Sequence, residues 1–213
     1  MGQIRWSAPL LIVGAVTAAV GTIIHPPGET SVYTSEALWV PSHLMIFAGV
    51  TLLVFGFIGL YAAHAQVTGA LGLVAFLITT VGLIVSAGIA LAVGSILQPL
   101  TAAHAPDLWE LDGPLFTHPA IRLLLGLNYV WTAGLLLFAI ALTRAQVRPA
   151  WPAWLIVGGA ALGIVRAAVL ATVPQVLGTA APYLTANVLV IILTIGVIGL
   201  GWDLWFQRMA APD

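Results

Sequence analysis

The chain has 213 residues, of which 61% are hydrophobic and only 6% are charged, and its formal net charge is −1. Average globular domains carry about a quarter charged residues, so this composition excludes a water-soluble globule and predicts lipid as the main solvent. The sequence has no lysine, so a basic surface for nucleic acid is not expected. It also has no cysteine, which excludes disulfides, thiolate metal sites and iron–sulfur clusters.

Six segments are apolar and long enough to cross about 30 Å of hydrocarbon as helices that rise about 1.5 Å per residue. Backbone polar groups in lipid must be satisfied within the segment, and the period-two alternation of barrel strands is missing, so we expect helices. Turn signals such as Thr68-Gly69 and Arg148-Pro149 separate the segments. The predicted spans are Ser7–Ile24, Trp39–Ala63, Gly69–Leu97, Pro119–Leu142, Pro152–Val173 and Tyr183–Phe206. The sequence therefore predicts an all-α integral membrane bundle of six transmembrane helices, forming one domain over residues 1–213.

Arginines and acidic residues fall on opposite sides if the six helices alternate across the membrane. One side holds Arg5, Arg144, Arg148 and Arg208. The other side holds Glu29, Glu36, Asp107, Glu110 and Asp112, with Trp39 and Trp109 expected at its interface. Because short cytoplasmic loops are enriched in arginine, the pattern predicts a multi-pass protein of the cell membrane with both termini cytoplasmic. Its expected partners are the lipid bilayer and other membrane subunits.

Most polar residues of the apolar segments fall toward the outer side. The ones that can ionise or donate hydrogen bonds there are His25, His43, His104, His118, Gln98, Arg122, Asn128, Arg166 and Asn187. Only His64 among the histidines falls on the inner side, where we expect it to be solvated and without a role. Ionisable groups at membrane depth are costly to desolvate, so their convergence predicts an outward-facing pocket that binds a ligand.

Arg166 lies about seven residues, or roughly 10 Å, below the outer end of the fifth span. A charged arginine there costs ~2.5–3.5 kcal/mol on insertion scales unless it finds a partner or reaches the interface. Its partner can be a loop carboxylate such as Glu36 or Asp112. It can equally be a bound anion such as a propionate, a phosphate or a lipid head group.

Two cofactors suit this pocket. Haem b could be ligated by His43 and His118 from opposite sides, with Arg122 and Arg166 holding its propionates and Asn128 in the same pocket. A transition metal could instead be bound by the side chains of His25, His43, His104 and His118, with carboxylates of the outer loops. No HxxxH or HExxH spacing is present, so either site has to be assembled from distant segments. Both hypotheses predict a role in membrane redox or electron transfer.

The same polar residues are also compatible with other functions. The chain can be a structural or assembly subunit of a larger membrane complex, in which the polar groups pair with a partner. It can also be a metal-dependent lipid hydrolase, or a small-anion carrier that uses Arg166. Whether it is an enzyme is not decided by any motif.

The segments HPPGE, WVPSHL and GLYAAHAQVTGALGLVAF resemble small uncharacterised bacterial polytopic membrane proteins. The four central helices, with histidines near their ends, also look loosely like haem-binding four-helix membrane cytochromes. The chain departs from that pattern because its third and fifth predicted helices contain no histidine. The resemblance therefore implies at most one haem, near the outer surface.

Overall fold

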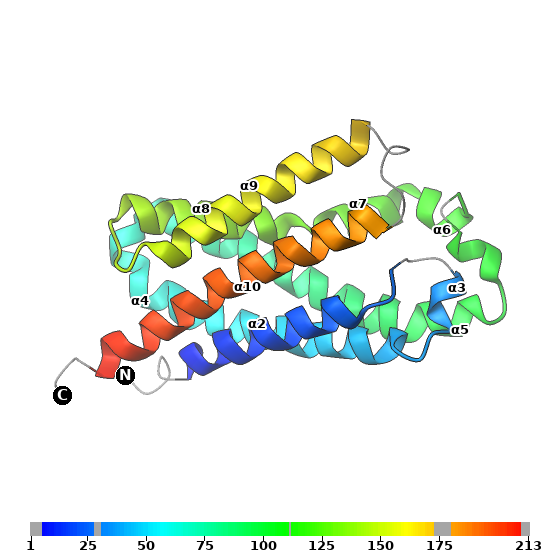
Figure 1. Cartoon of the computed structure of the whole chain (residues 1–213), viewed down its shortest axis with the longest axis horizontal. Coiled ribbons are helices and arrows are strands. Elements are labelled where there is room, and N and C mark those ends of the chain that lie inside the picture. The colour runs from blue at the N-terminus through cyan, green and yellow to red at the C-terminus, as the bar shows by residue number, and fades with distance from the viewer. Residues whose placement is uncertain (1–5, 28–30, 111, 173–179, 210–213) are drawn as a thin grey trace.

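The computed structural model describes residues 6–27, 31–110, 112–172 and 180–209, with only the backbone described at 31–32, 166–172, 180–185 and 207–209. The described residues form helices and contain no strand, which confirms the all-α prediction (Figure 1). The elements are α2 (Ser7–Ile24), α3 (Ser31–Thr34), α4 (Trp39–Gly88), the π-helix η1 (Ile89–Leu97), α5 (Gln98–Ala102), the 3-10 helix η2 (Pro106–Trp109), α6 (Pro114–Thr117), α7 (Pro119–Leu127), α8 (Val130–Arg144), α9 (Trp151–Thr172) and α10 (Ala180–Met209).

Helix α4 reverses its direction at Gly69. This residue has φ 57° and ψ −146°, a combination that only glycine adopts without strain. The two arms then run antiparallel, with the rings of Phe57 and Phe76 stacked at 6.1 Å between centroids. Near the far end of the hairpin, the indole nitrogen of Trp39 donates to the carbonyl of Gly94 at 2.8 Å. The turn predicted at Thr68-Gly69 is therefore confirmed.

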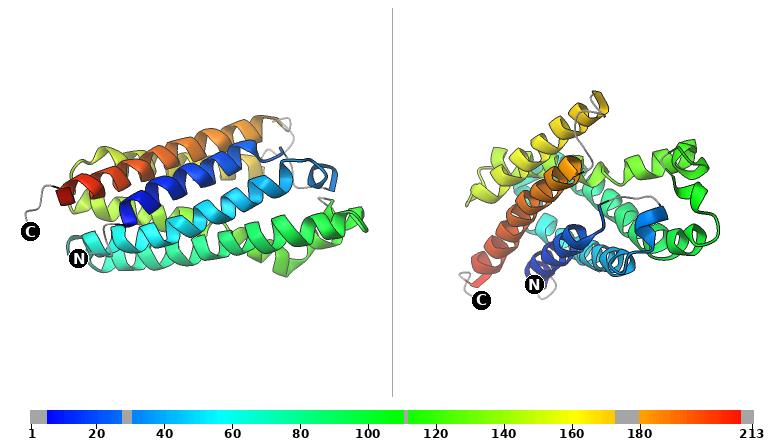
Figure 2. Two further views of the ribbon diagram at one scale, coloured as in Figure 1. Left: turned by 90° about the horizontal axis from the view of Figure 1, so that it is seen from below. Right: turned by 45° about the vertical axis from the view of Figure 1, so that its right-hand side comes forward.

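The long helices close into a ring around one apolar core. Helix α2 packs on the first arm of α4, α8 packs on the second arm, α9 follows α8, and α10 packs on both α9 and α2 (Figures 1 and 2). Neighbouring backbones come close where glycines face them, as Gly14 faces Gly49 between α2 and α4. The core contains fully buried Phe138 and Leu204 among its larger side chains.

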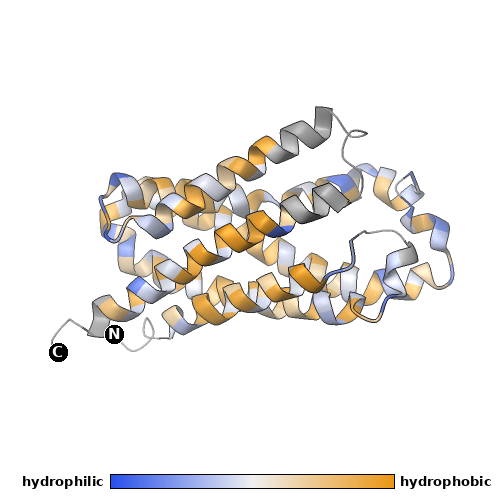
Figure 3. Ribbon diagram, in the orientation of Figure 1, coloured by the Kyte–Doolittle hydropathy of each residue, from blue (hydrophilic) through white to orange (hydrophobic). Residues whose placement is uncertain are grey.

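The outward faces of these helices are apolar too, as Figure 3 shows along the middle of the bundle. Large side chains such as Phe55 and Leu77 are more than half exposed. Four described helical stretches are long and apolar enough to cross a membrane: Ser7–Ile24, Trp39–Ala102, Pro119–Arg144 and Ala186–Phe206. The described apolar part of α9, Trp151–Val165, is shorter. These helices are consistent with a membrane protein, in which lipid is the solvent of such apolar surfaces.

The fourth predicted segment is interrupted. A turn at Asn128 and Tyr129 separates α7 from α8, and none of the nine residues of α7 is buried. The start of this segment therefore packs loosely, whereas α8 contributes Leu135, Phe138 and Leu142 to the core.

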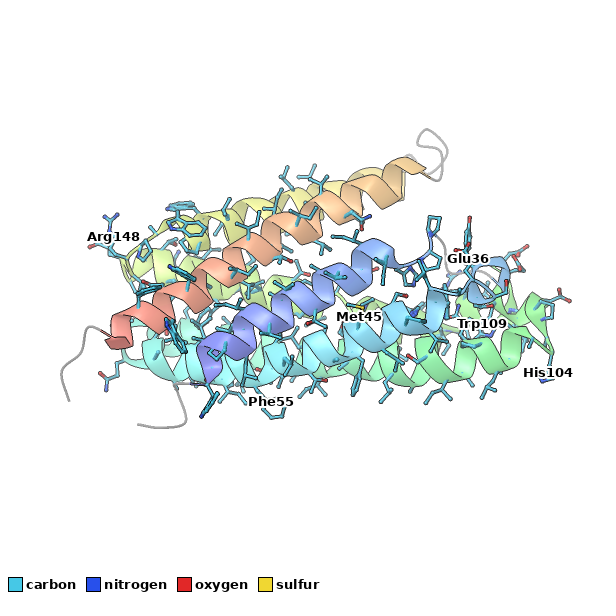
Figure 4. The ribbon with its side chains drawn as sticks, turned by 60° about the horizontal axis from the view of Figure 1, so that its bottom comes forward. Glu36, Met45, Phe55, His104, Trp109 and Arg148 are labelled. Carbon is cyan, nitrogen blue, oxygen red and sulfur yellow. The ribbon has the colours of Figure 1, made fainter. Side chains whose placement is uncertain are left out.

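The two ends of the bundle carry different loops. Glu36, His104 and Trp109 lie at one end and Arg148 lies at the other (Figure 4). The start of α2 and the end of α10 lie together at the Arg148 end (Figure 1). This arrangement agrees with the predicted separation of acidic and arginine-bearing loops.

Candidate functional site

Three aromatic rings meet at the end of the bundle where Glu36 and His104 lie. His25 directly follows α2, while Trp39 and His43 lie in the first turns of α4. The ring centroids are 4.7 Å apart for His25 and His43, 4.9 Å for His25 and Trp39, and 4.6 Å for Trp39 and His43. Trp39 is 0% exposed and His43 is 8% exposed. The end of one helix and the start of the next thus form a compact, largely dry cluster.

Backbone carbonyls set the tautomer of both imidazoles. Nδ1 of His43 lies 2.9 Å from the carbonyl oxygen of Trp39, and Nδ1 of His25 lies 2.6 Å from that of Pro26. A carbonyl oxygen can only accept, so each Nδ1 carries the proton and donates it. In the neutral rings the lone pair then belongs to Nε2. That is the orientation in which protein histidines bind metals through Nε2.

A π-helical turn closes the cluster from the second arm of the hairpin. Within η1, the hydroxyl of Ser95 donates to the carbonyl of Ala90, five residues earlier. Gly94 lies against the Cδ2–Nε2 edge of His43, and its carbonyl accepts the Trp39 indole hydrogen. π-Helical turns are rare and are frequent at functional sites.

His25 is kept neutral by its surroundings. Its pKa is lowered from 6.5 to about 4, chiefly by burial and next by the neighbouring His43, while the hydrogen bond to Pro26 opposes the shift. At neutral pH the ring is therefore uncharged, as metal ligation requires.

The other predicted site residues are not among those that contact the His25–His43 cluster, or their side chains lie outside the described residues. His118 is exposed and accepts the Ala120 backbone N–H at the start of α7. Arg122 is exposed and donates from Nε to the carbonyl of Phe116 at 2.9 Å. His104 is exposed, and Asn128 lies at the turn between α7 and α8. The side chain of Arg166 lies outside the described residues. The arrangement brings together His25 and His43, and the pairing of His43 with His118 stays a prediction.

The donor set limits what this site can hold. In the described part of the chain, no group of three or more histidine, aspartate or glutamate side chains is placed to hold a metal ion. Two imidazoles that share one ion at Nε2–metal distances of about 2.0–2.1 Å have ring centroids roughly 4.5–6.5 Å apart, depending on the angle at the metal. The 4.7 Å between His25 and His43 falls within that range. The spacing of the two rings is therefore compatible with a shared ion.

The burial and contacts of several residues differ from what the sequence predicts. Trp39 and Trp109, expected at the interface, are buried at 0% and 3% exposure, and Trp109 donates to the Thr101 hydroxyl at 2.6 Å. Gly94 carried no signal at all in the sequence. His64, expected to be solvated, is 7% exposed and donates from Nδ1 to the Leu60 carbonyl. The helical spacing of Trp39 and His43 is the signal that could have identified the first of these contacts.

The fold and the cluster define an all-α chain with several helices apolar enough to cross a membrane and a histidine pair at one end of the bundle. No protein-family model, curated protein or solved structure matches the chain. The resemblance to small bacterial polytopic membrane proteins and to membrane cytochromes therefore stays a prediction.

Proposed function

We propose that the chain spans the cell membrane six times with both termini cytoplasmic. The reversal at Gly69 supports two spans within Trp39–Ala102, because its arms pack antiparallel. Helix α9 has 22 residues, about 33 Å at 1.5 Å per residue, which is enough to cross the hydrocarbon layer. The arginine-bearing end, marked by Arg148 in Figure 4, is then the cytoplasmic one.

We further propose that the outer end binds a transition-metal ion through His25 and His43 and serves membrane redox chemistry. The observation that carries this proposal is the pair of contacting imidazoles, each donating Nδ1–H to a backbone carbonyl. Hydrogen bonds of this kind fix the tautomer and orientation of histidines that bind metals. Imidazole suits copper, iron and zinc, of which copper and iron exchange electrons.

The geometry supports a metal ion more than haem. Haem bound between His43 and His118 needs both imidazoles on one iron. His118 is exposed and its Nδ1 holds the first turn of α7, whereas His43 is buried beside His25. The two histidines that lie together therefore favour a single metal ion over haem.

Metal analysis of the purified protein tests this function. We expect about one copper, iron or zinc ion per chain in detergent micelles after equilibration with each metal and removal of the excess. His25→Ala and His43→Ala should each lose the ion. The matched controls His104→Ala and His118→Ala should retain it, because both side chains are exposed. Wild-type protein that binds none of the three metals contradicts the proposal. A Soret band that disappears in His118→Ala would instead favour haem.

A further inference from the structure

We infer that Gly94 and Trp39 are the positioning residues of the histidine pair: the π-helical turn at Gly94 seats the His43 imidazole, and Trp39 holds that turn. This inference rests on the proposed metal site. Neither residue is a ligand, since Gly94 has no side chain and the indole nitrogen only donates.

Gly94 fits the His43 ring because it lacks a Cβ. A Cβ at position 94 would collide with Cδ2 and Nε2 of His43 and would lie 2.7 Å from its Cγ. The ring is fixed on its other side by the hydrogen bond from Nδ1 to the Trp39 carbonyl. An alanine at position 94 therefore displaces the edge that carries the metal-binding nitrogen.

Trp39 ties the cluster together through three separate groups. Its carbonyl accepts the Nδ1 proton of His43, and its indole N–H donates to the Gly94 carbonyl. Its ring contacts the imidazoles of His25 and His43. A single buried residue, Trp39, thus links α4, η1 and the end of α2.

The π-helix decides which residue faces this cluster. A π-helix has more residues in each turn than an α-helix, because its hydrogen bonds join residues five apart. An α-helical path from Ile89 to Leu97 would change the rotation of position 94 about the helix axis. The bond from the Trp39 indole to the Gly94 carbonyl is made within the π-helical turn, so it supports the position of that turn. Losing this support is expected to lower metal affinity about 10–100-fold, as for other groups that orient metal ligands.

The experiment compares Gly94→Ala with Gly88→Ala in the full-length protein. Gly88 ends α4 immediately before η1, and a Cβ there meets nothing within 4 Å, so it is a matched control. Trp39→Phe is the second variant, because it removes the indole donor and keeps a smaller aromatic ring at this buried position. Two readouts are used. One is the affinity and ligand-field absorption spectrum of bound Co²⁺, and the other is the ¹⁵N imidazole spectrum of His43 in metal-free protein.

We expect Gly94→Ala and Trp39→Phe to bind Co²⁺ at least about tenfold more weakly, with an altered spectrum, and to shift the His43 resonances. Gly88→Ala should match the wild type. If the wild type binds Co²⁺ and both test variants match its affinity and spectrum, the positioning role is wrong while the metal site stands. If the wild type binds no Co²⁺, the proposed metal site is wrong. In that case, unchanged His43 resonances in both test variants also overturn the positioning role of Gly94 and Trp39. Shifted His43 resonances support that positioning role without the metal.

Discussion

Replacing Gly49 by alanine tests how tightly α2 and α4 are packed. A Cβ at Gly49 would lie 2.7 Å from the Gly14 carbonyl oxygen and 2.8 Å from the Ala18 Cα, and closer still to the Ala18 backbone nitrogen. Ordinary contacts between such atoms are about 3.5 Å or longer. Since all three neighbours are backbone atoms, no side chain can rotate away, and α2 has to move by roughly 1 Å.

The expected magnitude follows from two opposing effects. Overpacking of this kind costs about 1–3 kcal/mol. The better helix propensity of alanine stabilises the helix by up to about 1 kcal/mol and partly offsets this cost. We therefore expect Gly49→Ala to lower the free energy of unfolding by about 1–2 kcal/mol. In the control Gly158→Ala, the new Cβ meets nothing within 4 Å, so only the propensity gain remains.

Equilibrium unfolding of both variants in mixed detergent micelles gives the comparison. The two free energies of unfolding should differ by about 2–3 kcal/mol, with Gly158→Ala the more stable. A Gly49→Ala protein as stable as Gly158→Ala would refute the reasoning, because α2 would then have to lie farther from α4 than the structure places it.

Three further outcomes are expected. Phe138→Ala should lose about 3–5 kcal/mol of unfolding free energy, because Phe138 is 0% exposed and contacts Phe57. The control Phe55→Ala, at an exposed position, should change the unfolding free energy by less than about 1 kcal/mol. Equal losses in the two variants would contradict the placement of the core. Gly69→Ala should cost about 1–3 kcal/mol from backbone strain alone, since the new Cβ has open space, and a denaturant titration that shows no loss would exclude the positive φ. In metal-free protein with a chelator present, His25 should make stability depend on pH. Its folded-state pKa of about 4 lies below 6.5, so the unfolded state binds the proton first as the pH falls. Up to about 3 kcal/mol of unfolding free energy is therefore lost between pH 6.5 and pH 4. That loss should be absent from thermal melts of His25→Gln, and an identical pH profile in the variant would contradict it.

Much of the fold follows from the apolar pattern. The first predicted span has the bounds of α2, since its apolar run is closed by His25 and two prolines. Thr68-Gly69 is a turn signal between two apolar runs, and Gly69 has the backbone angles that glycine tolerates. These features are local, so a single sequence contains their causes.

The site depends on which helices become neighbours, and the sequence carries little information about that. His43 and His118 each lie at the start of a predicted helix, which is why the sequence suggests them as a ligand pair. In the structure, His25 is the histidine that contacts His43. The reason is that α2 packs on the first arm of α4, which brings the end of α2 beside the start of α4. The π-helix is equally non-local, because its support at Gly94 comes from Trp39 across the hairpin.

The ring of helices also has a consequence for biosynthesis. Helix α10 is the last of the described helices to be made, and it packs against α2, the first. Until it is made, the faces of α2 and α9 that it covers are without this neighbour. The contact between α10 and α2 can therefore form only after α10 has been synthesised. Before that, the pairing of α2 with α4 is already available, because both helices precede α10 in the chain.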